Sequence, residues 1–266
     1  MEVFIPDKIK KYISDKPYYT DNIGLSDSCV LIFDNMVLKI EEHTDKSYET
    51  VRMMQWLENK IPSPKIICCE IHNDKLYTLM SRINGKMACD EYYMEQSDKM
   101  VGLLAEGLKA LWNIDISDCP RTLPVDYDLN IAQQFVSEKK VDEKKLDLAL
   151  LKKFGLKNPE EILAWLKTHI PDTEPVLSHG DYCLPNILLE NDCISGYIDL
   201  GDCAVSDKWK DISMCYISLK NNFSGCFGGR IYPDFNPCIL FEKLDIKPDW
   251  DKLNYWLLLN ELFKLK

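Results

Sequence analysis

The chain has 266 residues, of which 46% are hydrophobic and 28% charged, a composition typical of globular proteins rather than disordered ones. Its formal net charge of −11 argues against nonspecific nucleic-acid binding, because phosphate contacts depend on an excess of Lys and Arg. We therefore expect no nucleic-acid partner, and cationic ligands are favoured instead.

The cysteines and the hydropathy pattern predict a cytoplasmic protein. The eleven cysteines form no C-x-x-C motif, which favours buried free thiols in a reducing compartment over disulfides or a zinc site. No apolar run approaches the roughly eighteen residues of a membrane span, and the N-terminal segment has no long apolar core of a signal peptide. We expect no membrane partner, and the sequence does not predict an oligomeric state.

The first part of the chain is expected to form a small β-rich lobe, residues 1–83. Two hairpins are predicted there, around Asp34-Asn35 and around Asn73-Asp74, because apolar runs flank dipeptides that tolerate tight turns. Between the hairpins, Ser47 is expected to cap a helix that runs through YETVRMMQWLENK.

The second part, residues 84–266, is expected to be a larger and mainly helical lobe. Apolar residues at helical spacing follow Ser97, and Asn158-Pro159 begins another helix as a cap followed by a first-turn proline. Further helices are predicted at about 129–152, 207–222 and 251–265. Strands and helices that segregate in this way predict an α+β fold of two lobes.

The segment 176–202 carries the candidate chemistry. Asn186 follows Asp181 by five residues, and Asp199 follows Asn186 by thirteen. NILLE and CISGYID are predicted strands joined by Asn191-Asp192, so all three side chains are expected to converge at one edge. Two carboxylates and an amide oxygen suit Mg²⁺, which prefers hard oxygen ligands. Each aspartate could instead cap a helix or a turn, but their joint spacing favours the metal site.

The pattern HGDxxxxN followed by D-x-G resembles the aminoglycoside phosphotransferase family, and more distantly the protein kinases. The segments that look most like the 3′-phosphotransferases of that family cover nearly the whole chain; they include MVLKI, LMSRINGK, HGDYCLPN, SGYIDLGD, SDKWKDI and IKPDWDKLNYWLLLNELF. The resemblance implies a protein-kinase-like two-lobed fold, ATP or GTP as phosphoryl donor, and Mg²⁺.

The resemblance also implies roles for individual residues. Asp181 looks like the catalytic carboxylate that orients the attacking hydroxyl, Asn186 and Asp199 like the magnesium ligands, and Lys39 like the lysine that pairs with the α- and β-phosphates. The remaining nucleotide-binding candidates are Glu49 as partner of Lys39, Ser26 in the phosphate loop, Ser81 and Ile83 at the adenine edge, and Ile198 beneath the adenine.

The substrate implied by the resemblance is an aminoglycoside, which is a polycation. Acidic residues of the helical part could form an anionic groove, although singly they could be ordinary solvated residues; they are Asp142, Glu143, Asp147, Glu160 and Glu261. Glu261 is expected to face the substrate, with Asn260 beside it. Both lie on the last predicted helix.

Three positions depart from the family pattern. Counting back from Trp56 puts Thr50 where the helix glutamate is expected, Asp202 replaces an arginine, and Lys264 to Lys266 extend the chain beyond Phe263. Two alternatives therefore stay open. One is a kinase for another hydroxylated small molecule, such as choline, a sugar or a macrolide, and the other is a catalytically silent nucleotide-binding protein.

Overall fold

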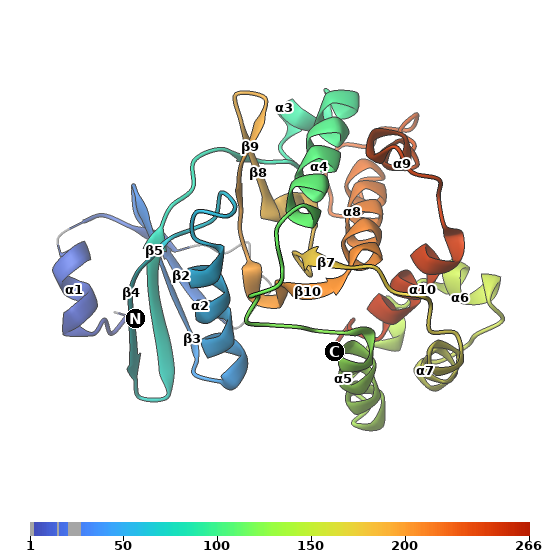
Figure 1. The fold of residues 1–266 in the computed structure, drawn as a ribbon, viewed down its shortest axis with the longest axis horizontal. Coiled ribbons are helices and arrows are strands. Elements are labelled where there is room, and N and C mark those ends of the chain that lie inside the picture. Colours follow the sequence, from blue (N-terminus) through green and yellow to red (C-terminus); the bar gives the residue numbers. More distant parts are fainter. Residues whose placement is uncertain (1–2, 15, 21–27) are drawn as a thin grey trace. The chain divides into compact units, whose positions relative to one another are not determined.

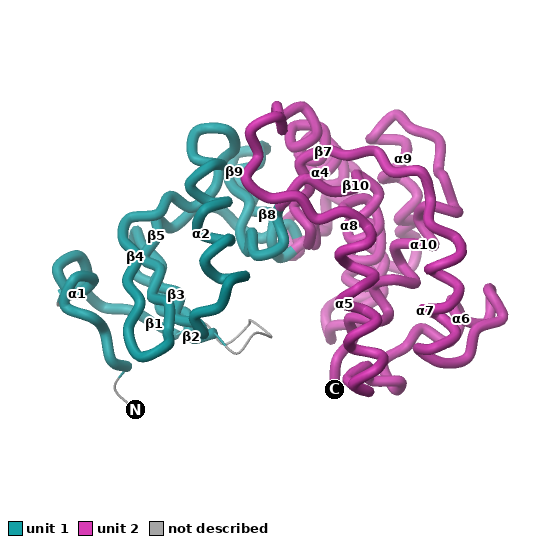
Figure 2. The backbone as a smooth tube through the Cα atoms, turned by 60° about the horizontal axis from the view of Figure 1, so that its bottom comes forward, with its two compact units in different colours: residues 1–88, 185–203 teal, residues 89–184, 204–266 magenta. Residues whose placement is uncertain are grey.

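The computed structural model describes residues 3–14, 16–20 and 28–266, and the chain forms two compact units (Figure 1, Figure 2). Unit 1 comprises residues 1–88 and 185–203, and unit 2 comprises residues 89–184 and 204–266. The sequence analysis expected a single boundary after residue 83, whereas the observed units are each made of two segments of the chain. A short strand, β6 (Lys86–Met87), pairs with β8 (Ile187–Glu190), so the segment from 185 to 203 groups with the N-terminal residues.

Unit 1 is built on a five-stranded antiparallel sheet in the order β1-β2-β3-β5-β4. Both predicted hairpins are present, and Asn73 and Asp74 adopt the positive φ values (47° and 57°) of a tight turn. The elements are α1 (Asp7–Ile13), β1 (Tyr19–Thr20), β2 (Cys29–Ile32), β3 (Met36–Glu42), α2 (Asp45–Leu57), β4 (Ile66–His72) and β5 (Lys75–Ser81).

The N-cap of α2 lies three residues before the expected cap, Ser47. Thr44 is this N-cap, and the Thr44 and Ser47 side chains each accept a hydrogen bond from the other residue's backbone amide (3.1 Å and 2.9 Å). Such a reciprocal pair satisfies two amides that the helix leaves without partners. Ser47 therefore belongs to the cap, although it is not the N-cap itself.

A second sheet of unit 1 has the order β6-β8-β9. Its hairpin turns at Asn191 and Asp192, which both have positive φ (50° and 63°). The short helical turns η2 (Leu184–Asn186) and η3 (Leu200–Asp202) flank the hairpin, whose second strand is β9 (Cys193–Tyr197). The predicted strands NILLE and CISGYID are therefore confirmed.

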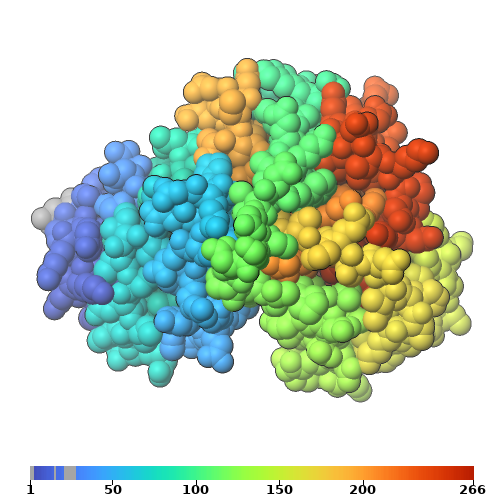
Figure 3. All heavy atoms as spheres, viewed as in Figure 1, coloured from blue at the N-terminus to red at the C-terminus, as the bar shows by residue number. Residues whose placement is uncertain are grey.

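Unit 2 is mainly helical, with a two-stranded antiparallel sheet of β7 and β10. The predicted cap of α7 is present, since the Asn158 side chain accepts from the Glu161 amide (2.8 Å). In Figure 3 the surfaces of α5 and α7 adjoin, as their packing requires. The elements are α3 (Glu91–Met94), α4 (Ser97–Trp112), α5 (Val125–Ser137), η1 (Glu143–Lys145), α6 (Leu148–Lys153), α7 (Pro159–Thr168), β7 (Pro175–Ser178), β10 (Ala204–Asp207), α8 (Lys208–Phe223), α9 (Ile239–Leu244) and α10 (Trp250–Glu261).

Two predicted helices differ from the observed ones. The helix expected at 129–152 is broken into α5, η1 and α6, because Lys139 adopts a left-handed conformation (φ 53°) and Asp147 caps a new helix. The helix expected to reach residue 265 ends at Glu261.

None of the eleven cysteines takes part in a disulfide, as expected. Only Cys68, Cys203 and Cys215 are buried, so the expected burial of the thiols holds for these three alone. Across the described part of the chain, no helix combines the length and the apolar character that crossing a membrane requires.

Candidate active site

The His179-Gly180-Asp181 loop of unit 2 is held by a buried carboxylate on α8. Asp211 is fully buried and accepts hydrogen bonds from the Ser178 hydroxyl (3.0 Å), the His179 amide (2.8 Å) and the Gly180 amide (2.9 Å). Burial raises the pKa of the Asp211 carboxyl above its ordinary value, and these bonds together with His179 oppose that rise. The end of β7 and the start of the loop are thus tied to α8.

The residues after Asp181 are anchored as well. The buried Tyr182 donates from its hydroxyl to the Leu104 carbonyl (2.8 Å), and the Leu184 amide donates to the Ser218 hydroxyl of α8 (2.9 Å). His179 is buried, and its Nδ1 accepts from the Asp181 amide (3.4 Å), a hydrogen bond within the loop. Asp181, which is only partly buried, is therefore presented by a loop fixed on both sides.

Asn186 and Asp199 meet at one edge of the β8–β9 hairpin in unit 1. The Ile198 amide donates to the Asn186 carbonyl (2.9 Å), which brings the residue before Asp199 against Asn186. Asp199 is exposed and adopts a left-handed backbone (φ 56°, ψ 58°), which is a strained conformation for a residue with a side chain. The backbone at these two positions is thus adjacent within unit 1, and the convergence of the three side chains stays a prediction.

The oxygen donors of Asn186 and Asp199 fit the hard-ligand chemistry of Mg²⁺. Among the described residues, no group of three or more His, Cys, Asp or Glu could hold a metal ion. Two protein oxygens are few for a cation cage, but they suit an ion whose other ligands are phosphate oxygens and water.

Lys39 forms a different ion pair from the expected one. On β3 the Lys39 ammonium lies 3.0 Å from the Glu41 carboxylate, and both side chains are 25% exposed. Alternate residues of a strand share a face, which explains this pair. Glu49 instead pairs with Arg52 (2.8 Å), one turn later on α2. The expected Lys39–Glu49 pair is therefore not formed in the structure.

On α2, the Thr50 hydroxyl donates weakly to the Gly201 carbonyl of η3 (3.5 Å). On the preceding turn of α2, the Lys46 ammonium lies 2.7 Å from the Asp202 carboxylate. Two contacts thus connect α2 to η3, and the two departures Thr50 and Asp202 take part in them. Sequence reasoning noted both positions but did not relate them to each other.

The residues expected at the adenine lie in unit 1, and Ser26 of the expected phosphate loop falls outside the described residues. At the end of β5 the Ser81 hydroxyl accepts from the Lys65 amide (2.9 Å). Ile83 lies against β9 at Gly196, where an added Cβ would come within 2.5 Å of the Ile83 side chain. Glycine is thus required at 196, two residues before Ile198.

The expected substrate residues of unit 2 are placed differently from the prediction. Glu261 is only 4% exposed and accepts hydrogen bonds from the Asp147 amide (2.7 Å) and the Lys264 ammonium (2.7 Å), so it does not face an open groove. The Asp147 carboxylate caps α6 by accepting from the Ala149 and Leu150 amides (both 3.0 Å). Asn260 is half-buried on the last turn of α10.

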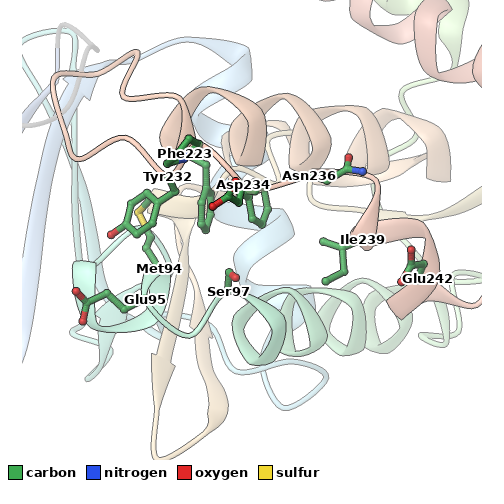
Figure 4. Close-up of a pocket in the computed structure, with 11 residues that line it drawn as sticks. Met94, Glu95, Ser97, Phe223, Tyr232, Asp234, Asn236, Ile239 and Glu242 are labelled. Atoms are coloured by element: carbon green, nitrogen blue, oxygen red, sulfur yellow. The ribbon is translucent and has the colours of Figure 1, made fainter.

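A pocket of about 480 Å³ in unit 2 holds none of the predicted residues (Figure 4). Aromatic and acidic side chains line it, among them Phe223, Tyr232, Phe235, Glu95, Asp234 and Glu242. Phe223 stacks on Phe235 with ring centroids 3.6 Å apart.

The most important residue that sequence reasoning missed is Asp211. It lies in the SDKWKDI segment, which was noted only as part of the resemblance. The signal was present, because an aspartate inside an otherwise apolar helix face is rarely buried without partners.

Comparison with known proteins agrees with this arrangement. Residues 24–236 match the model of the phosphotransferase enzyme family. An aminoglycoside 3′-phosphotransferase of Enterococcus faecalis is 35% identical, covering 97% of this chain and 98% of its own, and one of Staphylococcus aureus is 35% identical with the same coverage.

Among solved structures, an aminoglycoside phosphotransferase of Streptomyces rimosus, determined in complex with ADP and streptomycin, has the same fold. Its TM-score is 0.77 at 19% identity, over 96% of this chain and 95% of that one. The α+β, kinase-like two-lobed fold is thereby confirmed. The chain belongs to the phosphotransferase enzyme family, among its aminoglycoside phosphotransferases.

Proposed function

We propose that this chain is an ATP-dependent phosphotransferase that phosphorylates a hydroxyl of aminoglycoside antibiotics, the 3′-hydroxyl being favoured, and so confers resistance. The observation that carries the proposal is the match along nearly the whole chain to enzymes named for this reaction. The sequence also contains Asp181, Asn186, Asp199 and Lys39, to which the family resemblance assigns roles in the reaction. We place the enzyme in the cytoplasm, where ATP is available.

Each of these four residues has a proposed task in phosphoryl transfer, which depends on positioning and on neutralising charge. Asp181 accepts a hydrogen bond from the attacking hydroxyl and orients it toward the γ-phosphorus. Lys39 neutralises phosphate oxygens of the nucleotide, and for this it must exchange Glu41 for them. Asn186 and Asp199 hold Mg²⁺, which balances the charge of the phosphates.

The nucleotide base is proposed to bind at Ser81 and Ile83, with Ile198 packed against it. Backbone groups at the end of β5 supply the polar contacts, and the two isoleucines supply apolar surface. Ser26 is assigned to the phosphate loop by the family resemblance alone. Glu49 can assist Lys39 only after its pair with Arg52 has opened.

One observation keeps a second candidate in view. Glu261 is buried against a lysine of the same chain, whereas a site for a polycation should offer free carboxylates. A kinase for another hydroxylated substrate, such as choline, a sugar or a macrolide, has less need of such carboxylates.

The deciding experiment is an ADP-release assay in which kanamycin, streptomycin, choline, a sugar and a macrolide are compared at equal concentrations, with the Asp181→Ala variant as the blank. ADP release that needs Mg²⁺ and is fastest with kanamycin supports the proposal. Release that is fastest with choline, the sugar or the macrolide would replace it with the second candidate, and no substrate-dependent release would indicate a silent protein.

A further inference from the structure

Lys210 and Asp128 form a buried ion pair between the first turns of α8 and α5. The Lys210 ammonium lies 2.7 Å from the Asp128 carboxylate, and the two side chains are only 13% and 10% exposed. The same ammonium lies 5.8 Å from the centre of the Trp256 ring on α10, within the range of a cation–π contact. Three helices of unit 2 therefore meet at the charge of one lysine.

A lysine at this position is unfavourable both for the helix and for burial. Lys210 is the third residue of α8, and the positive end of a helix dipole disfavours a cation in the first turn. Taking both charges of the pair out of water costs further free energy. Apolar side chains would fill the same space without either cost, but their packing would not fix the direction in which the first turn of α8 faces.

The ion pair closes a ring of contacts around β10. The Arg121 carbonyl accepts from the Val205 amide, and the Val205 carbonyl accepts from the Leu123 amide (both 2.9 Å), which fixes the segment before α5 alongside β10. The strand β10 pairs with β7 and continues directly into α8. The two helices are thus connected at the segments from which they begin, and Lys210 and Asp128 connect them a second time through their first turns.

This second connection adjoins the residue that holds the catalytic loop. Asp211 follows Lys210 directly, and its carboxylate accepts from Ser178, His179 and Gly180 at the end of β7. Successive residues of a helix point about 100° apart, so a rotation of the first turn of α8 would move both side chains together. An ion pair that fixes the direction of Lys210 therefore also fixes the direction of Asp211.

We propose that Lys210 and Asp128 are positioning residues for phosphoryl transfer: their buried ion pair fixes the rotation of the first turn of α8, and through Asp211 it fixes the loop that presents Asp181. The inference rests on the proposed function, since it assigns two further residues to that same site. Neither residue needs to touch a substrate, because a small displacement of a catalytic group is enough to change the rate.

An apolar double variant separates positioning from stability. Lys210→Met leaves the Asp128 charge buried without the ammonium, so this single variant should lose both stability and activity. In Lys210→Met/Asp128→Leu neither charge remains to be buried, and Tm should return to within about 3 °C of wild type. Because the direction of the turn is still not fixed, we expect kcat to stay at least about tenfold below wild type, with KM for ATP unchanged. A double variant that regains both Tm and kcat would overturn the proposal, because the pair would then serve stability alone.

The same two substitutions at Lys243 and Asp98, an ion pair between α9 and α4, provide the control. Lys243→Met/Asp98→Leu removes the same two charges from unit 2 at a pair that joins neither α5 nor α8, so its kcat should equal that of wild type. An equal loss of kcat in this control would also count against the proposal, because charge removal alone would then explain the loss.

Amide hydrogen exchange tests the positioning without any substrate. The amides of His179 and Gly180 donate to Asp211, so in the double variant they should exchange at least about tenfold faster than in wild type. Amides in the buried part of α4, such as those of Leu104 and Ala105, should keep their rates. Unchanged exchange of the loop, or an equal acceleration in α4, would contradict a positioning role.

Failure of the two proposals can be told apart. If wild type phosphorylates no aminoglycoside but loop exchange still rises selectively in the double variant, the positioning of the loop stands and the proposed substrate is wrong. If wild type phosphorylates aminoglycosides and the double variant keeps both its kcat and its loop exchange, the positioning role is refuted. Should the double variant not fold, the exchange measurement on Asp128→Asn, which keeps the shape of the side chain, decides by the same criterion.

Discussion

Asp211 is the residue on which the candidate catalytic loop depends most. Its carboxylate accepts three hydrogen bonds, from Ser178, His179 and Gly180. The whole residue is buried away from solvent. Because the Asp211 carboxylate is buried, water cannot take its place as the acceptor for these three donors, and the loop is held in one conformation. Its function is therefore to position Asp181, which it does not itself contact.

Replacing Asp211 by asparagine should disturb both the loop and its catalysis. An asparagine has an NH₂ group in place of one carboxylate oxygen, so at least one of the three N–H or O–H donors would face another donor. We therefore expect kcat to fall at least tenfold and the free energy of unfolding to fall by about 2 kcal/mol. Steady-state kinetics and urea unfolding measure the two effects. The exposed Asp172→Asn serves as control, and equal kcat in the two variants would contradict the positioning role.

Asp181→Asn tests the catalytic assignment more directly. The amide keeps the shape of the side chain but is a poor acceptor for the proton of the attacking hydroxyl, so kcat should fall by about 100-fold or more. Nucleotide affinity, measured by titration calorimetry, should stay the same because Asp181 is proposed to contact the acceptor hydroxyl. A variant that retains more than about a tenth of wild-type turnover would exclude Asp181 from this role.

The position of a residue could be predicted where it depends only on neighbouring segments of the sequence. Asn186 and Asp199 flank one hairpin, so strand pairing alone predicts that they lie near each other, and the structure confirms the hairpin and a backbone bond from Ile198 to Asn186. Glu261 was misplaced for the opposite reason. Helical spacing tells which face a residue occupies, but the burial of Glu261 depends on a tail that returns to the loop after α5.

At the scale of elements, α2 and η3 are connected by an ion pair and a hydrogen bond. Lys46 and Thr50, one turn apart on α2, contact Asp202 and Gly201, and η3 begins next to the strained Asp199. An ion pair thus connects the helix to the turn that begins at Asp199, the proposed metal ligand.

A charge swap tests this connection. Lys46→Glu and Asp202→Lys should each raise the Mg²⁺ concentration for half-maximal rate by about two- to fivefold, and the double variant should recover most of the loss. The effect is small because both side chains are about half exposed (57% and 46%), and such pairs contribute at most about 1 kcal/mol.

The same swap at Lys243 and Asp98, an ion pair of unit 2, is the control. It should leave the Mg²⁺ titration unchanged in all three variants. Additive effects of Lys46→Glu and Asp202→Lys, without recovery in the double variant, would show that α2 does not position the turn.

The boundaries of elements show where sequence reasoning fails at this scale. The hairpins and the caps of α7 and α10 could be predicted because each has a local chemical signal, such as Asn73-Asp74 or Asp249. The break after Ser137 has no glycine or proline, and Lys139 takes a left-handed conformation that sequence does not favour.

For the whole molecule, the chain crosses between its two units three times, after residues 88, 184 and 203. The last two crossings enclose the hairpin with Asn186 and Asp199, whereas Asp181 precedes them in unit 2. A single boundary drawn along the sequence cannot represent this, because strand pairing between β6 and β8 joins segments about one hundred residues apart. The two-lobed class was nevertheless predictable from the segregation of strands and helices.

The charge of the whole molecule leads to a prediction of opposite sign for the two substrates. With a net charge of −11, the protein attracts a polycationic aminoglycoside and repels the anionic nucleotide over distances comparable to the Debye length, about 10 Å at 0.1 M salt. Raising NaCl from about 0.02 M to about 0.3 M should lower kcat/KM for kanamycin by about tenfold. Over the same range kcat/KM for ATP should rise or stay level.

Comparing how kcat/KM changes with NaCl concentration for kanamycin and for ATP makes this test independent of general salt effects on the enzyme. Inactivation by salt would lower both values of kcat/KM together, whereas electrostatic attraction changes them in different directions. A monocation such as choline should show a much shallower slope than kanamycin, because the attraction scales with ligand charge. Equal slopes for kanamycin and ATP would mean that the acidic surface does not guide the substrate, and that the affinity arises from contacts inside the site.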